Sequence, residues 1–338
     1  MLSIRGSVGT VALVPGSLNG ANITQDTARI RPSQRDIAPF LLQVLQAEIL
    51  QTQIEQNTVG QAVQGINIGE LRRLKIPIPP VTERKTICSM LAAWDDTITK
   101  TRMVLVQKRK LKNGLQQNLL TGKRQFPEFV RTNETRSTYF GTCPADWGYP
   151  RLGQIATEVS ERNHGDNGYT VLSCTKHQGL VDSLEYFGKR IFSSDKSNYR
   201  VVRRGQFAYA TNHIEEGSIG LLSTHEAGLI SPIYTVFETN ARKVYAPFLF
   251  RLFKTELYRH IFEVNTSSSV DRRGSLRWTQ FATIHVPLPT LGEQRRIAAV
   301  LDAVDSEIDL LTRQADALTR QKKVLMQKLL TGQIRVKV

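Results

Sequence analysis

The amino-acid sequence repeats itself at an offset of 210 residues, and this repeat constrains the architecture more than any other feature. The tetrapeptide Ile76–Pro79 matches Val286–Pro289, and the Leu-Leu-Thr-Gly motif at Leu119–Gly122 recurs unchanged at Leu329–Gly332. The residues between these markers align without a gap. Because chance does not produce so long an ungapped match, we expect the same structural segment to occur twice.

A weaker repeat precedes each copy, since the Ala-Pro-Phe-Leu motif at Ala38–Leu41 returns at Ala246–Leu249. The chain therefore consists of a variable unit followed by a helix, twice over, and we expect the first unit to lack about 70 residues at its start. Three explanations stay open: a start codon assigned too late, a truncated product, or completion by another chain. The expected segments are a truncated first unit (1–75), a first spacer helix (76–123), a linker (124–139), a complete second unit (140–290), a second spacer helix (291–332) and a tail (333–338).

Each spacer begins with an extended, proline-rich stretch and then shows helical spacing of apolar residues. In the second spacer, Thr290 and Glu293 form a capping-box pattern. Lys112 and Lys322 interrupt the two apolar stripes at equivalent positions. The expected seam residues are Ile87, Leu91, Trp94, Ile98 and Leu105 in the first helix, and Ile297, Leu301, Val304, Ile308, Leu311 and Leu318 in the second.

Two stripes with the same spacing favour pairing of the helices with each other as an antiparallel coiled coil. Packing of each stripe against a neighbouring domain is the alternative. A helical rod of this length would measure about 57 Å, which exceeds one turn of B-DNA at roughly 34–36 Å. The expected fold class is α+β, with two mixed α/β units at opposite ends of the paired helices.

Composition points to a polyanionic partner. The net charge is +15, with 45 Lys and Arg against 30 Asp and Glu, and such an excess favours nucleic acid over membrane as the partner. No apolar run is long enough to span a bilayer, no signal peptide is evident, and the three cysteines suggest no disulfide framework, so we expect a cytoplasmic protein. The basic cluster Lys108, Arg109, Lys110 and Lys112 is a candidate for phosphate or partner contact, although a solvated helix face explains it equally well.

The second unit has several loops that combine basic, aromatic and amide side chains between its expected strands. Arg and Lys suit guanine edges and phosphates, and Asn and Gln suit adenine. Ordinary surface composition is the alternative for any single loop. The candidate DNA-binding residues are Lys176, His177, Lys189, Arg190, Asn198, Tyr199, Asn212, Arg272, Arg273 and Arg277.

Catalytic signatures are missing from the sequence. There is no phosphate-binding loop, no Gly-x-Gly-x-x-Gly motif and no motif of the kind that grips a flipped base in amino-methyltransferases. The six histidines do not have metal-ligand spacing, and the adjacent Glu215 and Glu216 side chains should diverge. We therefore expect neither catalytic residues nor a metal site nor a resident cofactor.

These residues carry a resemblance to a known family. The proline-rich stretches, the helix start at Glu293–Ala298 and the Leu-Leu-Thr-Gly ends resemble the specificity subunit of type I restriction-modification enzymes. Glu185–Gly188, Glu216–Gly220 and Ser231–Phe237 resemble parts of a target recognition domain of that family. The similarity covers essentially the whole chain, except for the missing front of the first recognition domain.

The resemblance implies a non-enzymatic DNA reader in a phage-defence system. Each recognition domain would bind one half of a split site on double-stranded DNA, the paired helices would fix the gap, and two modification subunits would dock on the helices and domains. Restriction subunits would join through the complex. The resemblance assigns S-adenosylmethionine, ATP and Mg to partner subunits. With the first domain incomplete, we expect this chain alone to read one half-site well and the other poorly.

The competing hypothesis is a basic coiled-coil scaffold that binds partner proteins without reading DNA sequence. An orphan nuclease or methyltransferase is a third hypothesis, which the missing motifs disfavour. A reader prefers one bipartite sequence at fixed salt, whereas a scaffold shows no preference.

Overall fold

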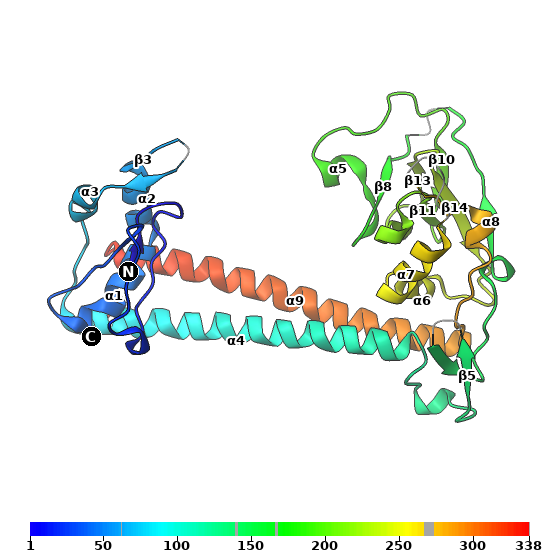
Figure 1. Cartoon of the computed structure of the whole chain (residues 1–338), viewed down its shortest axis with the longest axis horizontal. Coiled ribbons are helices and arrows are strands. Elements are labelled where there is room, and N and C mark those ends of the chain that lie inside the picture. The colour runs from blue at the N-terminus through cyan, green and yellow to red at the C-terminus, as the bar shows by residue number, and fades with distance from the viewer. Residues whose placement is uncertain (62, 139–140, 166–167, 267–273, 338) are drawn as a thin grey trace. The chain divides into compact units, whose positions relative to one another are not determined.

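A computed structural model describes residues 1–61, 63–138, 141–165, 168–266 and 274–337. They form two compact units, of which unit 1 comprises Met1–Gln107 and Ile308–Val338 and unit 2 comprises Lys108–Glu307. Both units draw on the same two long helices, α4 (Val81–Leu119) and α9 (Leu291–Leu330) (Figure 1). No helix in the described ranges has an apolar stretch long enough to cross a bilayer.

Unit 1 has a small lobe of helices and two-stranded antiparallel ladders. Pro39 lies in the first turn of α1, where proline's missing N–H costs no hydrogen bond. The ladders pair β1 with β2 and β3 with β4. The elements of the lobe are β1 (Leu2–Ser3), β2 (Thr27–Ala28), α1 (Ala38–Gln46), α2 (Glu48–Gln56), β3 (Thr58–Val59), β4 (Gly65–Ile66) and α3 (Ile68–Arg72), with 3-10 turns at Gly16–Leu18 and Arg35–Ile37.

The lobe of unit 1 is packed directly on the helix pair. Phe40 and Val44 of α1 and Leu50 of α2 share one buried cluster with Ile87 of α4 and Leu329 of α9. Burying aromatic and aliphatic side chains of this size stabilises the packing by roughly 1.5–3 kcal/mol for each residue. The start of α4 and the end of α9 are thus part of the core of unit 1.

Unit 2 contains the larger, mixed α/β lobe. Its central four-stranded antiparallel sheet has the order β12-β11-β14-β7, and three further two-stranded ladders are β5-β6, β8-β9 and β10-β13. The strands are β5 (Thr135–Thr138), β6 (Gly141–Pro144), β7 (Ala156–Val159), β8 (Leu172–Thr175), β9 (Gly179–Asp182), β10 (Arg200–Arg203), β11 (Phe207–Ala210), β12 (Ile219–Leu221), β13 (Ala227–Ile230) and β14 (Tyr234–Thr239). The helices are α5 (Ser183–Phe187), α6 (Ala246–Phe253), α7 (Glu256–Asn265) and α8 (Trp278–Phe281), with 3-10 turns at Pro127–Phe129, Leu152–Gln154 and Ile214–Glu216.

Both faces of the central sheet of unit 2 are covered. Successive side chains along each strand point to opposite faces, so each strand contributes to both cores. Phe207 and Tyr209 of β11 point into an aromatic cluster with α6, α7 and α8, whereas the intervening Ala208 faces a second core formed with β8, β9 and β10. The aromatic cluster also takes in Leu119 at the end of α4 and Ile297 at the start of α9. The lobe of unit 2 therefore holds its own segment of the helix pair.

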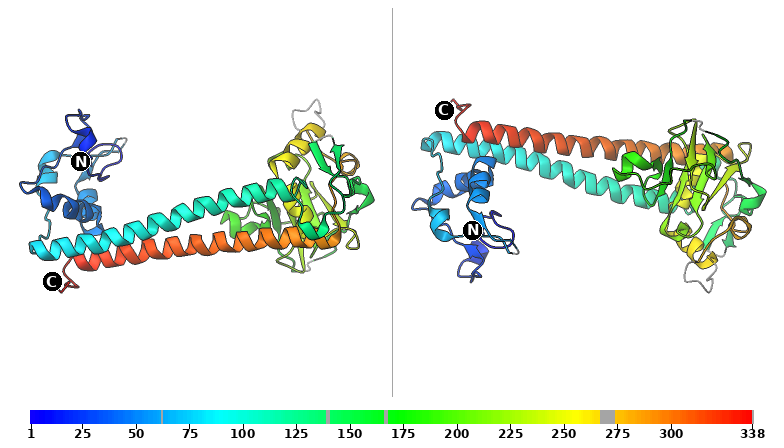
Figure 2. Two further views of the ribbon diagram at one scale, coloured as in Figure 1. Left: turned by 90° about the horizontal axis from the view of Figure 1, so that it is seen from below. Right: turned by 90° about the horizontal axis from the view of Figure 1, so that it is seen from above.

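The two helices run antiparallel in each unit, as the sequence predicted (Figures 1 and 2). In unit 1, Lys322 of α9 donates to both carboxylate oxygens of Asp95 on α4, at 2.6 and 2.7 Å. In unit 2, Lys112 of α4 forms an ion pair with Asp305 of α9 at 2.6 Å. These pairs are equivalent in the repeat, because Lys112 corresponds to Lys322 and Asp95 to Asp305. Every expected seam residue is buried or half-buried.

Of the two hydrogen bonds of the predicted capping box at the start of α9, one forms. The Glu293 amide donates to Thr290 Oγ1 at 3.3 Å, as the pattern predicted. The Glu293 carboxylate does not return to Thr290 but accepts hydrogen bonds from Trp147 Nε1 at 3.1 Å and Gln125 Nε2 at 3.4 Å. Glu293 thereby ties the start of α9 to the linker and to the segment before β7.

Candidate nucleic-acid interface

The turn between β8 and β9 presents three exposed polar side chains, Lys176, His177 and Gln178. Thr175 closes this turn, since its hydroxyl accepts from the Gln178 amide at 3.1 Å and donates to the Gly179 carbonyl at 3.2 Å. Gly179 ends the turn with a φ of +74°, a conformation that glycine adopts without strain. The predicted residues Lys176 and His177 are therefore displayed on a short, well-defined turn.

A second loop lies directly beside this turn. It runs from Thr211 to Gly217 and contains the predicted residue Asn212. A side chain at Gly217 would meet the carbonyl oxygen of Lys176 at 3.5 Å, and one at Gly220 would meet the Leu180 amide nitrogen at 2.5 Å. Glycine at position 220 allows the two backbones to approach closely, and glycine at position 217 adopts its φ of +93° without strain. The structure thus brings Lys176, His177 and Asn212 to adjacent loops.

Arg277 belongs to the same region of unit 2. It is exposed at the N-cap of α8, and the neighbouring Leu276 amide donates to the Thr211 carbonyl at 2.7 Å. Arg277 is thereby anchored next to the start of the 211–217 loop. Arg272 and Arg273, also predicted from the sequence, lie outside the described residues.

Lys189, Arg190 and Asn198 lie on the segment that follows α5, and all three are exposed. Gly188 ends α5 with a φ of +62°. The Arg190 guanidinium donates to the Ser193 carbonyl at 3.2 Å and lies 5.2 Å from the centroid of the Phe192 ring. These contacts keep Arg190 within its own segment, and the other guanidinium donors are available to a ligand.

Tyr199 does not fit the predicted role of base contact. Its side chain is buried in a cluster with Val201 and Leu229, and its hydroxyl accepts from the Ser193 amide at 3.2 Å. The ring therefore stabilises the loop rather than facing a ligand. The prediction failed because an aromatic residue within a basic loop is compatible with both packing and stacking, and sequence alone does not distinguish them.

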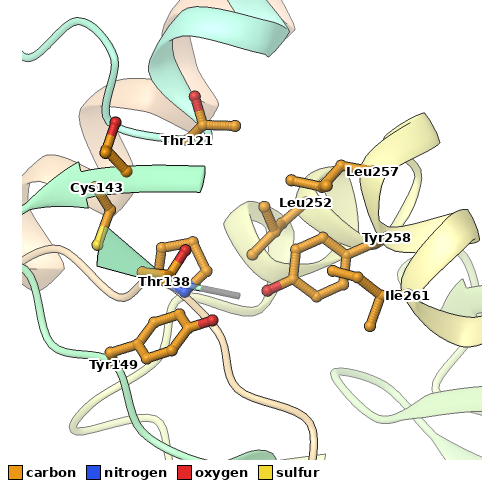
Figure 3. A pocket seen from close by; sticks show the side chains of 10 residues that line it. Thr121, Thr138, Cys143, Tyr149, Leu252, Leu257, Tyr258 and Ile261 are labelled. Atoms are coloured by element: carbon orange, nitrogen blue, oxygen red, sulfur yellow. The ribbon is translucent and has the colours of Figure 1, made fainter. Parts of the chain in front are cut away.

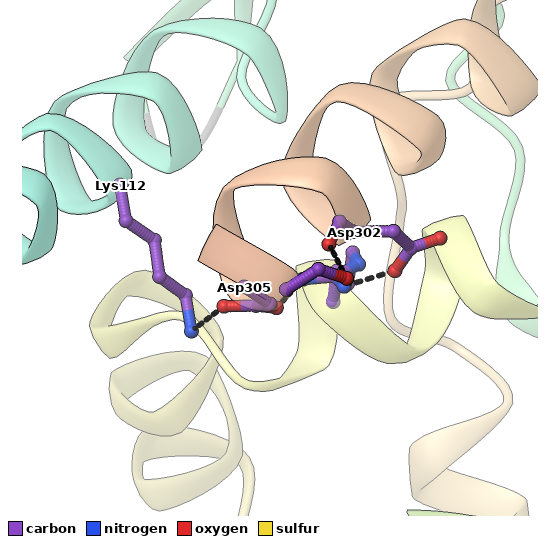
Figure 4. Close-up of polar contacts among 5 residues, drawn as sticks. Lys112, Asp302 and Asp305 are labelled. Atoms are coloured by element: carbon purple, nitrogen blue, oxygen red, sulfur yellow. Dashed lines mark hydrogen bonds and ion pairs between the residues drawn. The ribbon is translucent and has the colours of Figure 1, made fainter. Parts of the chain in front are cut away.

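The basic cluster of α4 divides into two pairs. Lys108 is bound by Glu307 and Lys112 by Asp305, so both serve the pairing of α4 with α9 in unit 2. Asp305 also binds Arg251 of α6 at 2.9 Å, and Asp302 binds the same guanidinium (Figure 4). Arg109 and Lys110 are exposed and remain the candidates for phosphate or partner contact.

A cluster of potential ligand atoms was not expected from the sequence. His213, Glu215 and Glu216 place one such atom each within 4.8 Å of the others, although adjacent glutamates were expected to diverge. The turn Ile214–Glu216 folds these side chains to one side. The His213 imidazole lies 3.3 Å from the Glu216 carboxylate, with both side chains largely in solvent. His213 and Glu216 therefore form an ordinary surface pair on the 211–217 loop.

A cavity in unit 2 is enclosed by the β5-β6 ladder and by α6 and α7, with Cys143, Tyr149, Leu252 and Tyr258 in its wall (Figure 3). Its volume is about 30 Å³, well below the roughly 300 Å³ of the smallest ligand pockets. The Tyr258 hydroxyl donates to the His285 carbonyl at 2.9 Å, so this hydroxyl is satisfied within the protein. The cavity has room for one or two water molecules.

A family model described as type I restriction modification DNA specificity domain matches residues 1–107 and 162–320. Two curated relatives come from Methanocaldococcus jannaschii. The type I restriction enzyme MjaVIII specificity subunit is 25% identical over 303 residues, covering 84% of this chain and 68% of the relative. The putative type I restriction enzyme MjaX specificity subunit is 26% identical over 348 residues, covering 98% and 76%.

Solved structures of the same kind share the fold. The S subunit of a type I restriction-modification system from M. genitalium matches with a TM-score of 0.54 and 18% identity, over 97% of this chain and 82% of that one. The HsdS subunit from Thermoanaerobacter tengcongensis matches with a TM-score of 0.50 and 17% identity, over 88% and 70%.

Proposed function

The chain belongs to the type I restriction modification DNA specificity domain family, and from this premise we propose that it reads a bipartite site on duplex DNA and docks two modification subunits. It performs no catalysis itself. The modification subunits supply methyl transfer from S-adenosylmethionine, and restriction subunits that join the complex supply ATP- and Mg-dependent cleavage. The complex works in the cytoplasm, where its DNA substrate lies.

The observation that carries this proposal is the surface formed by the 176–178 turn and the 211–217 loop. Lys176 and His177 are exposed on the turn, and Arg277 is anchored beside the neighbouring loop. Asn212 on that loop is half-buried, and because its Oδ1 is covered by the protein, its amide nitrogen is the group left to meet a base. A lysine or arginine can bind guanine, and an amide nitrogen can donate to a base acceptor. Direct readout of a short base sequence by unit 2 needs such a set of adjacent groups. Lys189, Arg190 and Asn198 are further candidates on the exposed segment after α5. Arg272 and Arg273, which lie outside the described residues, remain predictions from the sequence.

We assign roles to the segments on the same basis. Residues 140–290 form the target recognition domain that reads one half-site, and residues 1–75 correspond to the C-terminal part of another. The segments 76–123 and 291–332 are the spacers that fix the distance between half-sites, joined by the linker 124–139 and followed by the tail 333–338. The reciprocal Asp–Lys pairs support this role, because they fix the register of one spacer against the other.

The helices also offer a surface to modification subunits. In the unit 1 part of α4, Met103, Val104 and Val106 are exposed although they are large and apolar. Apolar side chains that remain exposed next to one another mark protein interaction sites. Arg109 and Lys110, farther along α4, would contact either phosphates or acidic groups of the partner.

The proposal is tested by selection from a pool of random duplexes, using the full chain with and without its modification subunits across a salt series. A reader enriches a defined motif whose overall affinity falls with salt while the preference persists. A scaffold protein binds through charge alone and enriches no motif at any salt. If the complete complex enriched no motif, sequence-specific reading would be refuted.

A further inference from the structure

Lys254 lies at the corner between α6 and α7, where its position is fixed from both sides. Its amide donates to the carbonyl of Phe250 at the end of α6, and the next residue, Thr255, caps α7 by accepting from the Tyr258 amide at 3.3 Å. The ammonium lies 5.5 Å from the centroid of the Phe250 ring. The side chain thus extends from a rigid base.

The ammonium of Lys254 ends against the backbones of both proposed reading loops. It donates to the carbonyls of Thr175 at 3.2 Å and Lys176 at 3.0 Å in the turn between β8 and β9. It also donates to the carbonyl of Gly217 at 2.8 Å, at the end of the 211–217 loop. All three protons of the ammonium therefore have an acceptor, and each acceptor belongs to a backbone that presents predicted base-contacting residues.

Placing the Lys254 ammonium in this partly buried position costs desolvation free energy. Burial lowers the pKa of Lys254 to about 8, because desolvation disfavours the charged form of the ammonium. A hydrophobic residue would fill the space without the desolvation cost, but it could not bond to three carbonyls at once.

We propose that Lys254 is a positioning residue for base reading, which holds the 176–178 turn and the 211–217 loop in fixed register so that Lys176, His177 and Asn212 meet adjacent bases together. This inference rests on the proposed function. The half-buried Lys254 has its three protons directed at backbone carbonyls, so we do not expect it to contact bases or phosphates itself. Its loss should therefore reduce discrimination between sequences while general affinity for duplex DNA stays the same.

The test uses the full chain with its modification subunits and a duplex pool randomised at every position. Lys254→Met removes all three hydrogen bonds at similar side-chain length, and Lys254→Gln keeps some of them. Lys243→Met, on the exposed turn before α6, is the matched control for loss of a lysine. We expect Lys254→Met to lower the preference for the half-site read by unit 2 at least tenfold, Lys254→Gln to lower it less, and Lys243→Met to leave it unchanged.

The outcomes separate this inference from the proposed function. A wild-type complex without any sequence preference refutes the proposed function and the inference with it. A wild-type preference that persists within twofold in a folded Lys254→Met complex overturns the inference alone. Loss of the folded state in both Lys254 variants, measured by circular dichroism, also overturns it, because the ammonium would then support the whole unit rather than position two loops.

Discussion

In unit 1, Lys322 Nζ of α9 forms an ion pair with both carboxylate oxygens of Asp95 on α4, at 2.6 and 2.7 Å. The lysine side chain is 15% exposed and the aspartate 48%. This difference matters because a charge that loses its partner is costly only where water cannot reach it. Lys322 interrupts the apolar seam of α9, so the stability of the helix pair at this position depends on the ion pair with Asp95.

We expect the two halves of this pair to respond differently to substitution. Asp95→Ala leaves a largely buried ammonium without its partner and should lower the free energy of unfolding by about 2 kcal/mol. Lys322→Met puts an apolar side chain into the seam and leaves an aspartate that water can reach, so it should be neutral or stabilising. Urea unfolding measures both. The adjacent Lys323→Met, which breaks only a surface pair with Glu48 at 3.1 Å, is the control and should change stability little. Equal losses for Asp95→Ala and Lys322→Met would contradict this account.

The repeat-related glutamates at the helix starts should titrate in opposite directions. Hydrogen bonding to Arg335 lowers the pKa of Glu83, whereas burial, with a smaller contribution from the acidic neighbours Asp146 and Glu128, raises the pKa of Glu293. The contribution of Glu83 is therefore present above its unfolded pKa and is lost as the pH falls below about 4.5. Glu293 binds its proton more tightly in the folded state, so its contribution falls as the pH rises above about 4.5.

Unfolding measured from pH 3 to pH 7 in Glu83→Gln and Glu293→Gln checks these signs. Compared with wild type, Glu83→Gln should weaken the loss of stability at the acid end, and Glu293→Gln should remove part of the decline toward neutral pH. The same slope in both variants would show that the two carboxylates have equivalent environments, contrary to the structure.

Gln125 and Arg335 occupy equivalent positions of the repeat, and each bonds to the glutamate at the start of the opposite helix in its own unit. Gln125→Arg should therefore recreate the Arg335 pairing at Glu293, lower the pKa of that carboxyl and raise stability at pH 7 by about 1 kcal/mol. The converse variant, Arg335→Gln, should lower the melting temperature. If Gln125→Arg destabilised unit 2, the similarity between the two helix starts would not extend to their electrostatics.

We expect Arg109 and Lys110 to contribute to DNA binding through their charge and not to the preference for particular bases. Reversing both to glutamate should weaken DNA binding by the complex uniformly across sequences and reduce the salt slope by about 1 for each phosphate that is no longer neutralised. Parallel titrations of cognate and scrambled duplexes across a series of salt concentrations provide the measurement. A change in the preferred bases would mean that these residues bond to base edges instead.

Lys176→Ala should have the opposite signature. Loss of a side chain that bonds to a base edge costs about 1–3 kcal/mol of discrimination at that position, so the preference at one base pair should fall roughly tenfold or more. Lys243→Ala is a suitable control, because Lys243 is exposed on the turn before α6 and its loss should leave base preference intact. A Lys176→Ala variant with unaltered preference would remove this residue from the reading surface.

The helices were predictable because a repeat makes every helical feature visible twice. In the sequence, Lys112 and Lys322 are matching interruptions of the apolar seam and Asp95 and Asp305 are matching acidic positions, but periodicity does not specify which charge meets which. The partners follow only from antiparallel register. The equivalence of Gln125 and Arg335 was also present in the sequence, although nothing there identified Glu83 and Glu293 as their acceptors.

The loops of unit 2 were less predictable, because their roles depend on burial. Tyr199 and Asn198 are neighbours in one basic segment, yet the tyrosine is buried and the asparagine exposed. Lys254 had no sequence signal at all, since its acceptors are three backbone carbonyls and carbonyls are present at every residue. Hydrogen bonds between a side chain and distant backbone leave no motif.

Mapping of methylated bases by sequencing, in DNA from cells that express the chain with its modification subunits, tests the central proposal most directly. The account predicts methylation confined to one motif, with a strictly preferred base sequence read by residues 140–290 and, at a constant gap, a second base sequence that is preferred only weakly. Methylation at scattered sites without a shared motif, or at a motif with two equally strict half-sites, would contradict it.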